Sequence, residues 1–259
     1  MLLAVDVGNT EVTVGLFVGE RLNGHWRVTT GTHRTPDEWA ALLTSFLSHA
    51  GHSTHEVRAA IQASVAPAVT EVLANGIHTT LGFAPVQVTA DSPLPIVLDV
   101  EEPHTVGADR VVNTLAAAEL YKRDTIVVDF GTATTFDCIT GDGVFLGGVI
   151  APGIETAAEN LSRRAAKLPA TELVPPERVI GRRTEECIRA GVLFGAADAV
   201  DGIVARIRAE WPRPQVPHVV ATGGLADPVA RLCKAVSLVE PGLTLIGLRI
   251  AARYLGLTW

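Results

Sequence analysis

Apolar residues along the chain recur with two periods, which predict a group of strands followed by strands that alternate with helices. Between residues 2 and 30, short apolar runs separated by turn signals predict three antiparallel strands. From residue 35 the spacing becomes helical, and residues 59–65, 69–81 and 85–88 then predict a strand, a helix and a further strand. The order βββαβαβ predicts a mixed sheet flanked by helices.

The second half of the chain repeats this plan. Three strands, two helices, one more strand and a closing helix are predicted at residues 125–130, 133–139, 143–150, about 154–166, 184–209, 218–221 and 242–255. We expect the polar trio Thr184-Glu185-Glu186 to cap the second of these helices. We therefore predict an α/β protein of two similar halves, residues 1–105 and residues 106–259.

One polar motif occurs in both halves, each time at the end of an apolar strand. Asp6-Val-Gly8 follows the first strand, and Asp129-Phe-Gly131 follows the apolar run at 126–128. Small polar residues and a second strand come next in each case, as in a β-hairpin. An ordinary hairpin with a polar tip would explain one copy. The repeat favours two similar halves whose loops face each other across a cleft.

The residue types in these hairpins suit a nucleotide and its cation. Glycine lets a bulky ligand approach the backbone closely. Thr132, Thr134 and Thr135 supply hydroxyl groups and backbone N–H donors for phosphate oxygens. Asp6 and Asp129 each supply an oxygen ligand for a hard cation. The sequence thus predicts that two glycine hairpins hold a nucleotide's phosphates and metal from both sides.

Three further segments allow two interpretations each. Gly107-Ala-Asp-Arg110 opens a predicted helix, where it is either a base beside a cation or a helix-terminal acid beside a surface arginine. Thr222-Gly-Gly224 ends a buried strand, where it is either a support for a flat ligand or a tight turn. His49, His52 and His55 are interpreted as part of a solvated loop rather than a metal site, because no nearby carboxylate or cysteine supports them.

Composition excludes several classes of protein. Of the 259 residues, 47% are apolar and 19% are charged, as in soluble globular proteins. The formal net charge of −7, without a long basic run, argues against nucleic-acid binding. The three separated cysteines predict neither a zinc site nor a disulfide framework, and they fit a reducing cytoplasm. The first strand holds Asp6 and follows no charged segment, which argues against a signal peptide or a membrane span.

Together the motifs resemble a known family. The paired hairpins and the Gly-Gly turn resemble the actin, sugar kinase and Hsp70 superfamily, which implies two ribonuclease H-like halves around an interdomain cleft. With Gly107-Ala-Asp-Arg110 and Gly148-Val-Ile-Ala-Pro-Gly153 in this order, the whole chain resembles the type III pantothenate kinases. The resemblance implies ATP-dependent phosphorylation of pantothenate to 4'-phosphopantothenate, the first step of coenzyme A biosynthesis. It also implies a cytoplasmic homodimer that needs magnesium and a monovalent cation, potassium or ammonium.

The resemblance also implies roles for individual residues. Asp109 would be the general base, Asp129 would hold the monovalent cation, and Asp6 would lie near magnesium and bind it through water. Thr132 would contact ATP, Thr222-Gly-Gly224 would support its adenosine, and Thr184 would reach pantothenate from the partner subunit. The first phosphate loop would consist of Asp6, Val7, Gly8, Asn9, Thr10, Glu11, Val12 and Thr13, and the pantothenate site would include Gly107, Ala108, Asp109 and Arg110.

Two positions depart from the pattern of this family. Many members carry a tyrosine at the position of Val100, where it lines the pantothenate site. Glu11 replaces a small polar residue and is expected to add negative charge beside the phosphates. We also expect the helix N-terminus and Arg110 to favour the ionised form of Asp109.

Two other functions are considered on the same fold. One is a non-catalytic nucleotide-binding regulatory protein, such as a transcription accessory factor. The other is an ATPase of the actin or Hsp70 type, for which the chain looks too short. The presence of Asp109, Arg110 and Asp129 favours the kinase, because nucleotide binding alone does not require a base beside a cation.

Overall fold

The computed structural model describes residues 1–31 and 33–259. The chain forms two compact units: residues 1–119 together with 243–259, and residues 120–242. This grouping differs from a division after residue 105, because it places most of α3 (Ala108–Tyr121) and all of α7 (Leu243–Tyr254) in the first unit. A Cβ added at Gly247 of α7 would lie 2.8 Å from the backbone carbon of Val112 in α3, so these two helices pack closely.

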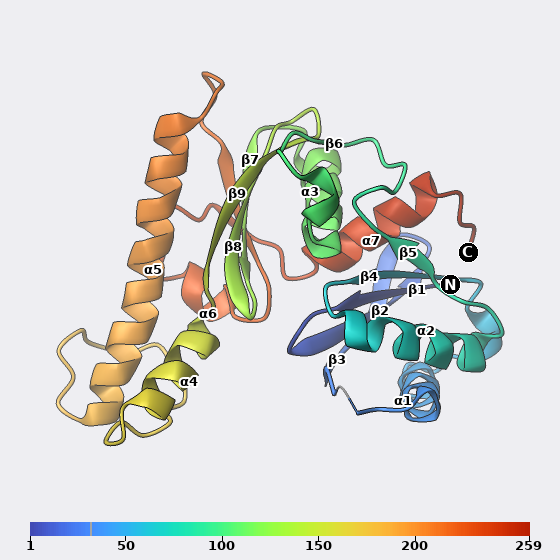
Figure 1. Cartoon of the computed structure of the whole chain (residues 1–259), viewed down its shortest axis with the longest axis horizontal. Coiled ribbons are helices and arrows are strands. Elements are labelled where there is room, and N and C mark those ends of the chain that lie inside the picture. Colours follow the sequence, from blue (N-terminus) through green and yellow to red (C-terminus); the bar gives the residue numbers. More distant parts are fainter. Residues whose placement is uncertain (32) are drawn as a thin grey trace. The chain divides into compact units, whose positions relative to one another are not determined.

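The first unit contains a five-stranded sheet in the order β3-β2-β1-β4-β5 (Figure 1). β1 is antiparallel to β2 and parallel to β4. The elements are β1 (Leu2–Val7), β2 (Glu11–Val18), β3 (Arg21–Thr29), α1 (Pro36–His49), η1 (Thr54–Glu56), β4 (Ala59–Ser64), α2 (Pro67–Leu81), β5 (Val86–Val88), β6 (Val97–Leu98), η2 (Pro103–Thr105), α3 and α7. The predicted order βββαβαβ is confirmed for this unit.

Alternation along β1 explains how both faces of this sheet are covered. Side chains point to opposite faces at successive positions. Leu3, Val5 and Val7 are buried with the apolar faces of α1 and α2. Leu2 and Ala4 are buried with α3 and α7. In Figure 1, α1 and α2 lie on one side of these strands and α7 on the other.

The second unit repeats the arrangement with the strand order β11-β10-β7-β8-β9. β7 is antiparallel to β8 and parallel to β10, as β1 is to β2 and β4. The elements are β7 (Thr125–Phe130), β8 (Ala133–Ile139), β9 (Val144–Pro152), α4 (Ile154–Arg164), α5 (Thr184–Glu210), β10 (His218–Thr222), α6 (Ala226–Ala230) and β11 (Leu238–Val239). The two similar α/β halves are therefore confirmed.

Three details differ from the sequence-based expectation. The short elements α6 and β11 were not predicted, because neither is long enough to show a period. The N-cap of α5 is Arg183, without a side-chain capping bond, so the prediction that Thr184 begins a polar cap is wrong. Thr184 is instead the first residue of the helix.

The three histidines near residue 50 lie in different local structures. His49 ends α1, where its Nδ1 lies 2.7 Å from the carbonyl of Ser45, and His55 lies in η1. Across residues 1–31 and 33–259, no group of three or more His, Cys, Asp or Glu side chains could hold a metal ion. No helix in the same residues is both long and apolar enough to cross a membrane.

A buried carboxylate fastens the second unit at the end opposite its Asp129 hairpin. Asp124, which is 4% exposed, precedes β7. Its Oδ1 accepts a hydrogen bond from the N–H of Gly141 and its Oδ2 accepts one from Nε1 of Trp211, both at 2.9 Å. The guanidinium of Arg213 lies 3.5 Å from Oδ1. One side chain therefore connects the β8–β9 turn with the end of α5.

We predict that Asp124→Asn lowers the free energy of unfolding of this unit by roughly 1–3 kcal/mol, because an amide has only one acceptor oxygen for two donors. Asp142→Asn is the matched control, since Asp142 pairs with the same Arg213 but is 63% exposed. An exposed ion pair contributes about 1 kcal/mol or less. Urea unfolding of the two variants tests this, and equal effects would contradict an anchoring role for Asp124.

Candidate active site

The first hairpin places a carboxylate at the carboxyl end of a central strand. Asp6 pairs with Thr13 of β2 and with Ala63 of β4. Because side chains alternate along β1, Asp6 points to the same face as Leu2 and Ala4, the face covered by α3 and α7. The N–H of Gly8 donates to the carbonyl of Glu11 at 2.9 Å and closes the turn. A Cβ on Gly8 would lie 2.9 Å from that same oxygen, so the turn requires glycine.

The structure divides the predicted loop residues into two groups. Asn9 and Thr10 are exposed at the tip, so their side chains and backbone can reach a ligand. Val7 and Val12 are fully buried in the core with α1 and α2. If these two valines contact phosphate, they can do so only through their backbone.

A neighbouring strand supplies a counter-charge for Glu11. Nε of Arg27, on β3, donates to Oε2 of Glu11 at 2.8 Å, and a second guanidinium nitrogen pairs with the same oxygen. The negative charge that Glu11 is expected to add beside the phosphates is therefore paired with Arg27. Both side chains are nearly half exposed, so the pair balances charge locally but adds little stability.

Gly107 to Arg110 lie at the same edge of the sheet as the first hairpin. β4 pairs with β1, and the next residue, Val65, donates its N–H to the carbonyl of Val7 at 3.0 Å. A Cβ on Gly107 would lie 3.2 Å from Cγ1 of Val65. Asp109 stands in the first turn of α3 and accepts a hydrogen bond from the N–H of Arg110 at 2.8 Å. The structure thus brings Asp6 and Asp109 to one edge and one face of the same unit.

Burial decides the protonation behaviour of Asp109. Removal from water raises the pKa of the Asp109 carboxyl, while the N–H and the charge of Arg110 lower it by less. Arg110 favours the ionised form of Asp109, as expected, but desolvation is the larger effect, so the net pKa is raised. A carboxylate with a raised pKa is a stronger base, and such shifts are common at catalytic positions.

The second hairpin places its carboxylate against a glycine turn. Asp129 pairs with Thr222 of β10, the residue before Gly223. Gly223 has φ +93°, and a Cβ there would collide with Oδ1 of Asp129 and lie 2.7 Å from the N of Phe130. The Thr222-Gly-Gly224 turn therefore packs directly on the carboxylate. An anionic oxygen held among backbone atoms fits a site for a hard monovalent cation.

The tip of the second hairpin is joined to the start of α4. The carbonyl of Thr132 accepts a hydrogen bond from the N–H of Gly153 at 3.1 Å and another from Oγ1 of Thr156 at 2.8 Å. A Cβ on Gly153 would collide with the carbonyl oxygens of Gly131 and Thr132. Thr132 itself is exposed at the tip. These contacts fix the loop in which Thr132 is expected to contact ATP.

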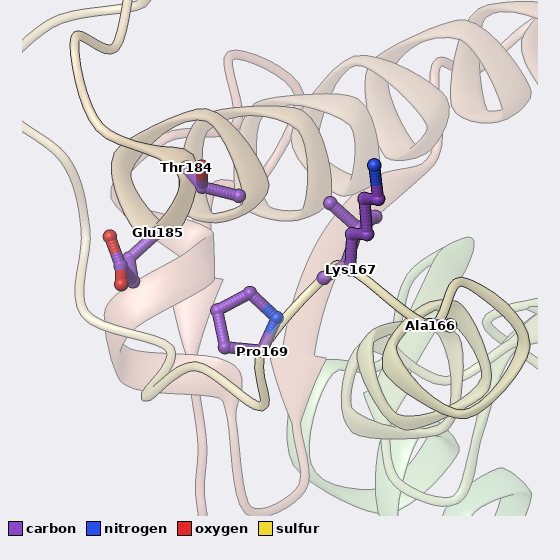
Figure 2. A pocket seen from close by; sticks show the side chains of 6 residues that line it. Ala166, Lys167, Pro169, Thr184 and Glu185 are labelled. Carbon is purple, nitrogen blue, oxygen red and sulfur yellow. The ribbon is translucent and has the colours of Figure 1, made fainter.

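Thr184 lies in a separate pocket at the start of α5. Figure 2 shows Thr184 and Glu185 on the helix opposite Lys167 and Pro169, which follow α4. The pocket has a volume of about 410 Å³ and is lined by Ala166, Lys167, Leu168, Pro169, Thr184 and Glu185. Sequence reasoning missed Lys167, because it belongs to no motif and follows the end of the predicted helix.

Known proteins resemble this chain over nearly its whole length. Residues 2–206 match the family model described as type III pantothenate kinase. The chain is 45% identical over 250 residues to the type III pantothenate kinase of Moorella thermoacetica, covering 96% of this chain and 98% of that protein. It is 44% identical over 250 residues to the type III pantothenate kinase of Roseiflexus sp., covering 96% and 97%.

Solved structures of low sequence identity share the fold. The (R)-2-hydroxyglutaryl-CoA dehydratase component A of Acidaminococcus fermentans is 16% identical, with a TM-score of 0.56 over 98% of this chain and 96% of that chain. The activator of the 2-hydroxyisocaproyl-CoA dehydratase from Clostridium difficile is 15% identical, with a TM-score of 0.56 over 98% and 93%. These two structures show only that the fold is shared. The family is identified by the family model and by the curated relatives. The chain belongs to the type III pantothenate kinase family.

Proposed function

We propose that the chain transfers the γ-phosphoryl group of ATP to the primary hydroxyl of pantothenate, giving 4'-phosphopantothenate and ADP in the first step of coenzyme A biosynthesis. Membership of the pantothenate kinase family makes the chain a kinase. The main support for this reaction is the environment of Asp109. Its carboxyl group has a raised pKa and lies at the same edge of the sheet as Asp6.

Phosphoryl transfer requires little covalent chemistry from the protein. It depends mainly on how the protein positions the reacting groups and stabilises their charge. The hydroxyl oxygen of pantothenate forms a bond to the γ-phosphorus, and the bond from that phosphorus to the bridging oxygen of ADP breaks. Asp109 accepts the hydroxyl proton, and ADP leaves with the electron pair of the broken bond. Arg110 positions the carboxylate of pantothenate, and Gly107 allows the substrate to approach the helix start closely.

The two hairpins bind different parts of ATP and its cations. The first loop, from Asp6 to Thr13, contacts the phosphates through the exposed residues Asn9 and Thr10 and through backbone N–H groups. Thr132 contacts ATP from the second hairpin, and the Thr222-Gly-Gly224 turn supports the adenosine. Asp6 would hold magnesium through water, and Asp129 would hold potassium or ammonium. These cations would neutralise phosphate charge.

We further propose a cytoplasmic homodimer in which Thr184 serves the pantothenate site of the partner. Thr184 is exposed in the pocket of Figure 2, so its hydroxyl can be reached by a ligand. Nearby Val179 and Ile180 are 68% and 83% exposed, which is unusual for apolar side chains and favours burial in an assembly. Along α5, a Cβ at Gly191 or Gly195 would meet nothing within 4 Å, so a second helix could approach closely.

Val100 is the position at which this pantothenate site differs from many relatives. It is half-buried in the segment that leads to Gly107. We propose that its smaller side chain lines the site in place of a tyrosine and removes one hydroxyl hydrogen bond, worth roughly 0.5–1.5 kcal/mol. The contribution of Val100 is thus to the affinity for pantothenate rather than to the transfer step.

A coupled assay of ADP release, with pantothenate present or omitted, tests the function. The proposal predicts that ADP forms only when pantothenate is present. ADP release without pantothenate would identify an ATPase instead. ATP binding without ADP release under either condition would identify a nucleotide-binding regulatory protein.

Asp109→Asn separates catalysis from stability. The amide keeps an oxygen acceptor for the N–H of Arg110 but cannot accept the hydroxyl proton, so we expect kcat to fall by roughly 10²–10⁴-fold with ATP affinity nearly unchanged. In the native protein the raised pKa makes ionised Asp109 a cost to stability. That cost is fully present above the folded-state pKa and disappears below the usual value of 3.8.

The melting temperature of Asp109→Asn at pH 7 should therefore equal or exceed that of the native protein, and the difference should vanish in acid. The acid limb of kcat/KM for the native enzyme should report a pKa above 3.8. If Asp109 only capped its helix, the substitution would lower the melting temperature and leave kcat intact.

Gly223→Ala tests the monovalent cation at Asp129. A Cβ at this position collides with the Asp129 carboxylate. Local strain of this kind costs roughly 1–3 kcal/mol, so we expect the potassium concentration for half-maximal activity to rise by roughly 5- to 150-fold. Activity should be measured in sodium buffer with added potassium or ammonium.

Gly82→Ala is the matched control for Gly223→Ala. Gly82 has a similar φ of +82°, but a Cβ there meets nothing within 4 Å. The Gly82→Ala variant should lose stability through the same backbone strain, and its activity should respond to potassium as that of the native protein does. Equal rates of the native enzyme in sodium, potassium and ammonium would rule out a selective cation site.

A further inference from the structure

Thr30 lies directly behind the first phosphate loop. It follows β3 and is 5% exposed, although it carries a hydroxyl group. Its Oγ1 donates to the carbonyl of Gly8 at 2.8 Å. Its backbone N–H donates to the carbonyl of Thr10, also at 2.8 Å. One residue therefore holds two carbonyls of a loop whose tip residues are exposed.

The bond to Gly8 fixes the direction of a peptide group. No peptide bond in the described residues is cis. In a trans peptide the C=O and the following N–H point in opposite directions. Because the carbonyl of Gly8 points toward Thr30, the N–H of Asn9 points away from it. Asn9 is at the exposed tip, so this N–H is directed to where the loop can meet a ligand.

The second unit contains a similar arrangement. In that hairpin Oγ1 of Thr156, from the segment after its third strand, donates to the carbonyl of Thr132 at 2.8 Å. Thr132 occupies the position after Gly131, as Asn9 follows Gly8. In each unit, then, a threonine beyond the third strand donates to a carbonyl of the hairpin loop, which belongs to the glycine in the first unit and to the residue after the glycine in the second. Its occurrence in both halves favours a role in the loop's function over an isolated packing contact.

We propose that Thr30 is a positioning residue for ATP: its hydroxyl fixes the Gly8–Asn9 peptide so that the N–H of Asn9 donates to a phosphate oxygen. This inference rests on the proposed function, because it takes ATP as the ligand of the loop. Thr30 does not touch ATP and acts only through the loop. The gain is preorganisation, since a loop already held in its binding conformation loses less freedom when the ligand arrives.

Thr30→Val, which is nearly isosteric, removes the hydroxyl and keeps the backbone bond. We expect Thr30→Val to raise the Kd for a non-hydrolysable ATP analogue and the KM for ATP by roughly two- to tenfold, as for the loss of one net hydrogen bond. The KM for pantothenate should stay close to the native value. Thr30→Ser, which keeps the hydroxyl, should restore ATP affinity.

Thr80→Val is the control for simple loss of a hydroxyl. Oγ1 of Thr80 donates to the carbonyl of Gly76 at the same 2.8 Å, in the same unit but within α2. The Thr80→Val substitution should leave the affinity for ATP unchanged. If Thr30→Val folds poorly, Thr30→Ala replaces it, and the melting temperature of each variant is measured on the same preparation.

Two results would overturn the inference. One is an ATP affinity of Thr30→Val equal to that of Thr80→Val. The other is a fall in melting temperature that Thr30→Ser fails to reverse, with both KM values changed alike. Calorimetric binding of the ATP analogue tests Thr30 even if pantothenate proves not to be the acceptor. Absence of pantothenate-dependent ADP release in the native protein would contradict the proposed function and leave the role of Thr30 to be decided by that binding measurement.

Discussion

The parallel pairing of two central strands in each unit is the constraint on which the site depends. β1 pairs with β4, and β7 pairs with β10, so the carboxyl ends of two neighbouring strands meet at one edge. In each unit an aspartate occupies the last position but one of the central strand, and glycine follows two residues later. The strand fixes the carboxylate, and the glycine permits a turn too tight for any Cβ or keeps the backbone open to a ligand. In each unit the hairpin loop and the end of the parallel neighbour strand lie beside this carboxylate.

Desolvation then determines what each acid can do. Asp109 is turned into a stronger base by burial at the start of α3, although an arginine and a helix N-terminus stand beside it. Glu11, at the exposed edge, is instead balanced by Arg27. Asp129 lies against the backbone of Gly223, where we propose that it holds a monovalent cation. The surroundings of these three carboxylates therefore differ, and so does the role that we propose for each.

Most of the fold and the positions of the motifs could be predicted from the local sequence. The periods of apolar residues predicted the strands and long helices, because those patterns arise from covering a sheet face or a helix face. Contacts between distant residues could not be read in this way. The return of α7 to α3 through Gly247, the pairing of Arg27 with Glu11 and the burial of Asp109 each depend on segments brought together only by folding. Thr30 was missed for the same reason: its partners, Gly8 and Thr10, lie about twenty positions earlier.

The central claim is that a phosphoryl group moves from ATP to the primary hydroxyl of pantothenate. Phosphorus NMR of the complete reaction measures this directly. The account predicts that the γ-phosphate signal of ATP is replaced by a phosphomonoester signal coupled to two equivalent or nearly equivalent methylene protons, as expected for a phosphorylated primary alcohol. Accumulation of inorganic phosphate alone, or a phosphoester coupled to a single proton, as on the secondary hydroxyl, would contradict it.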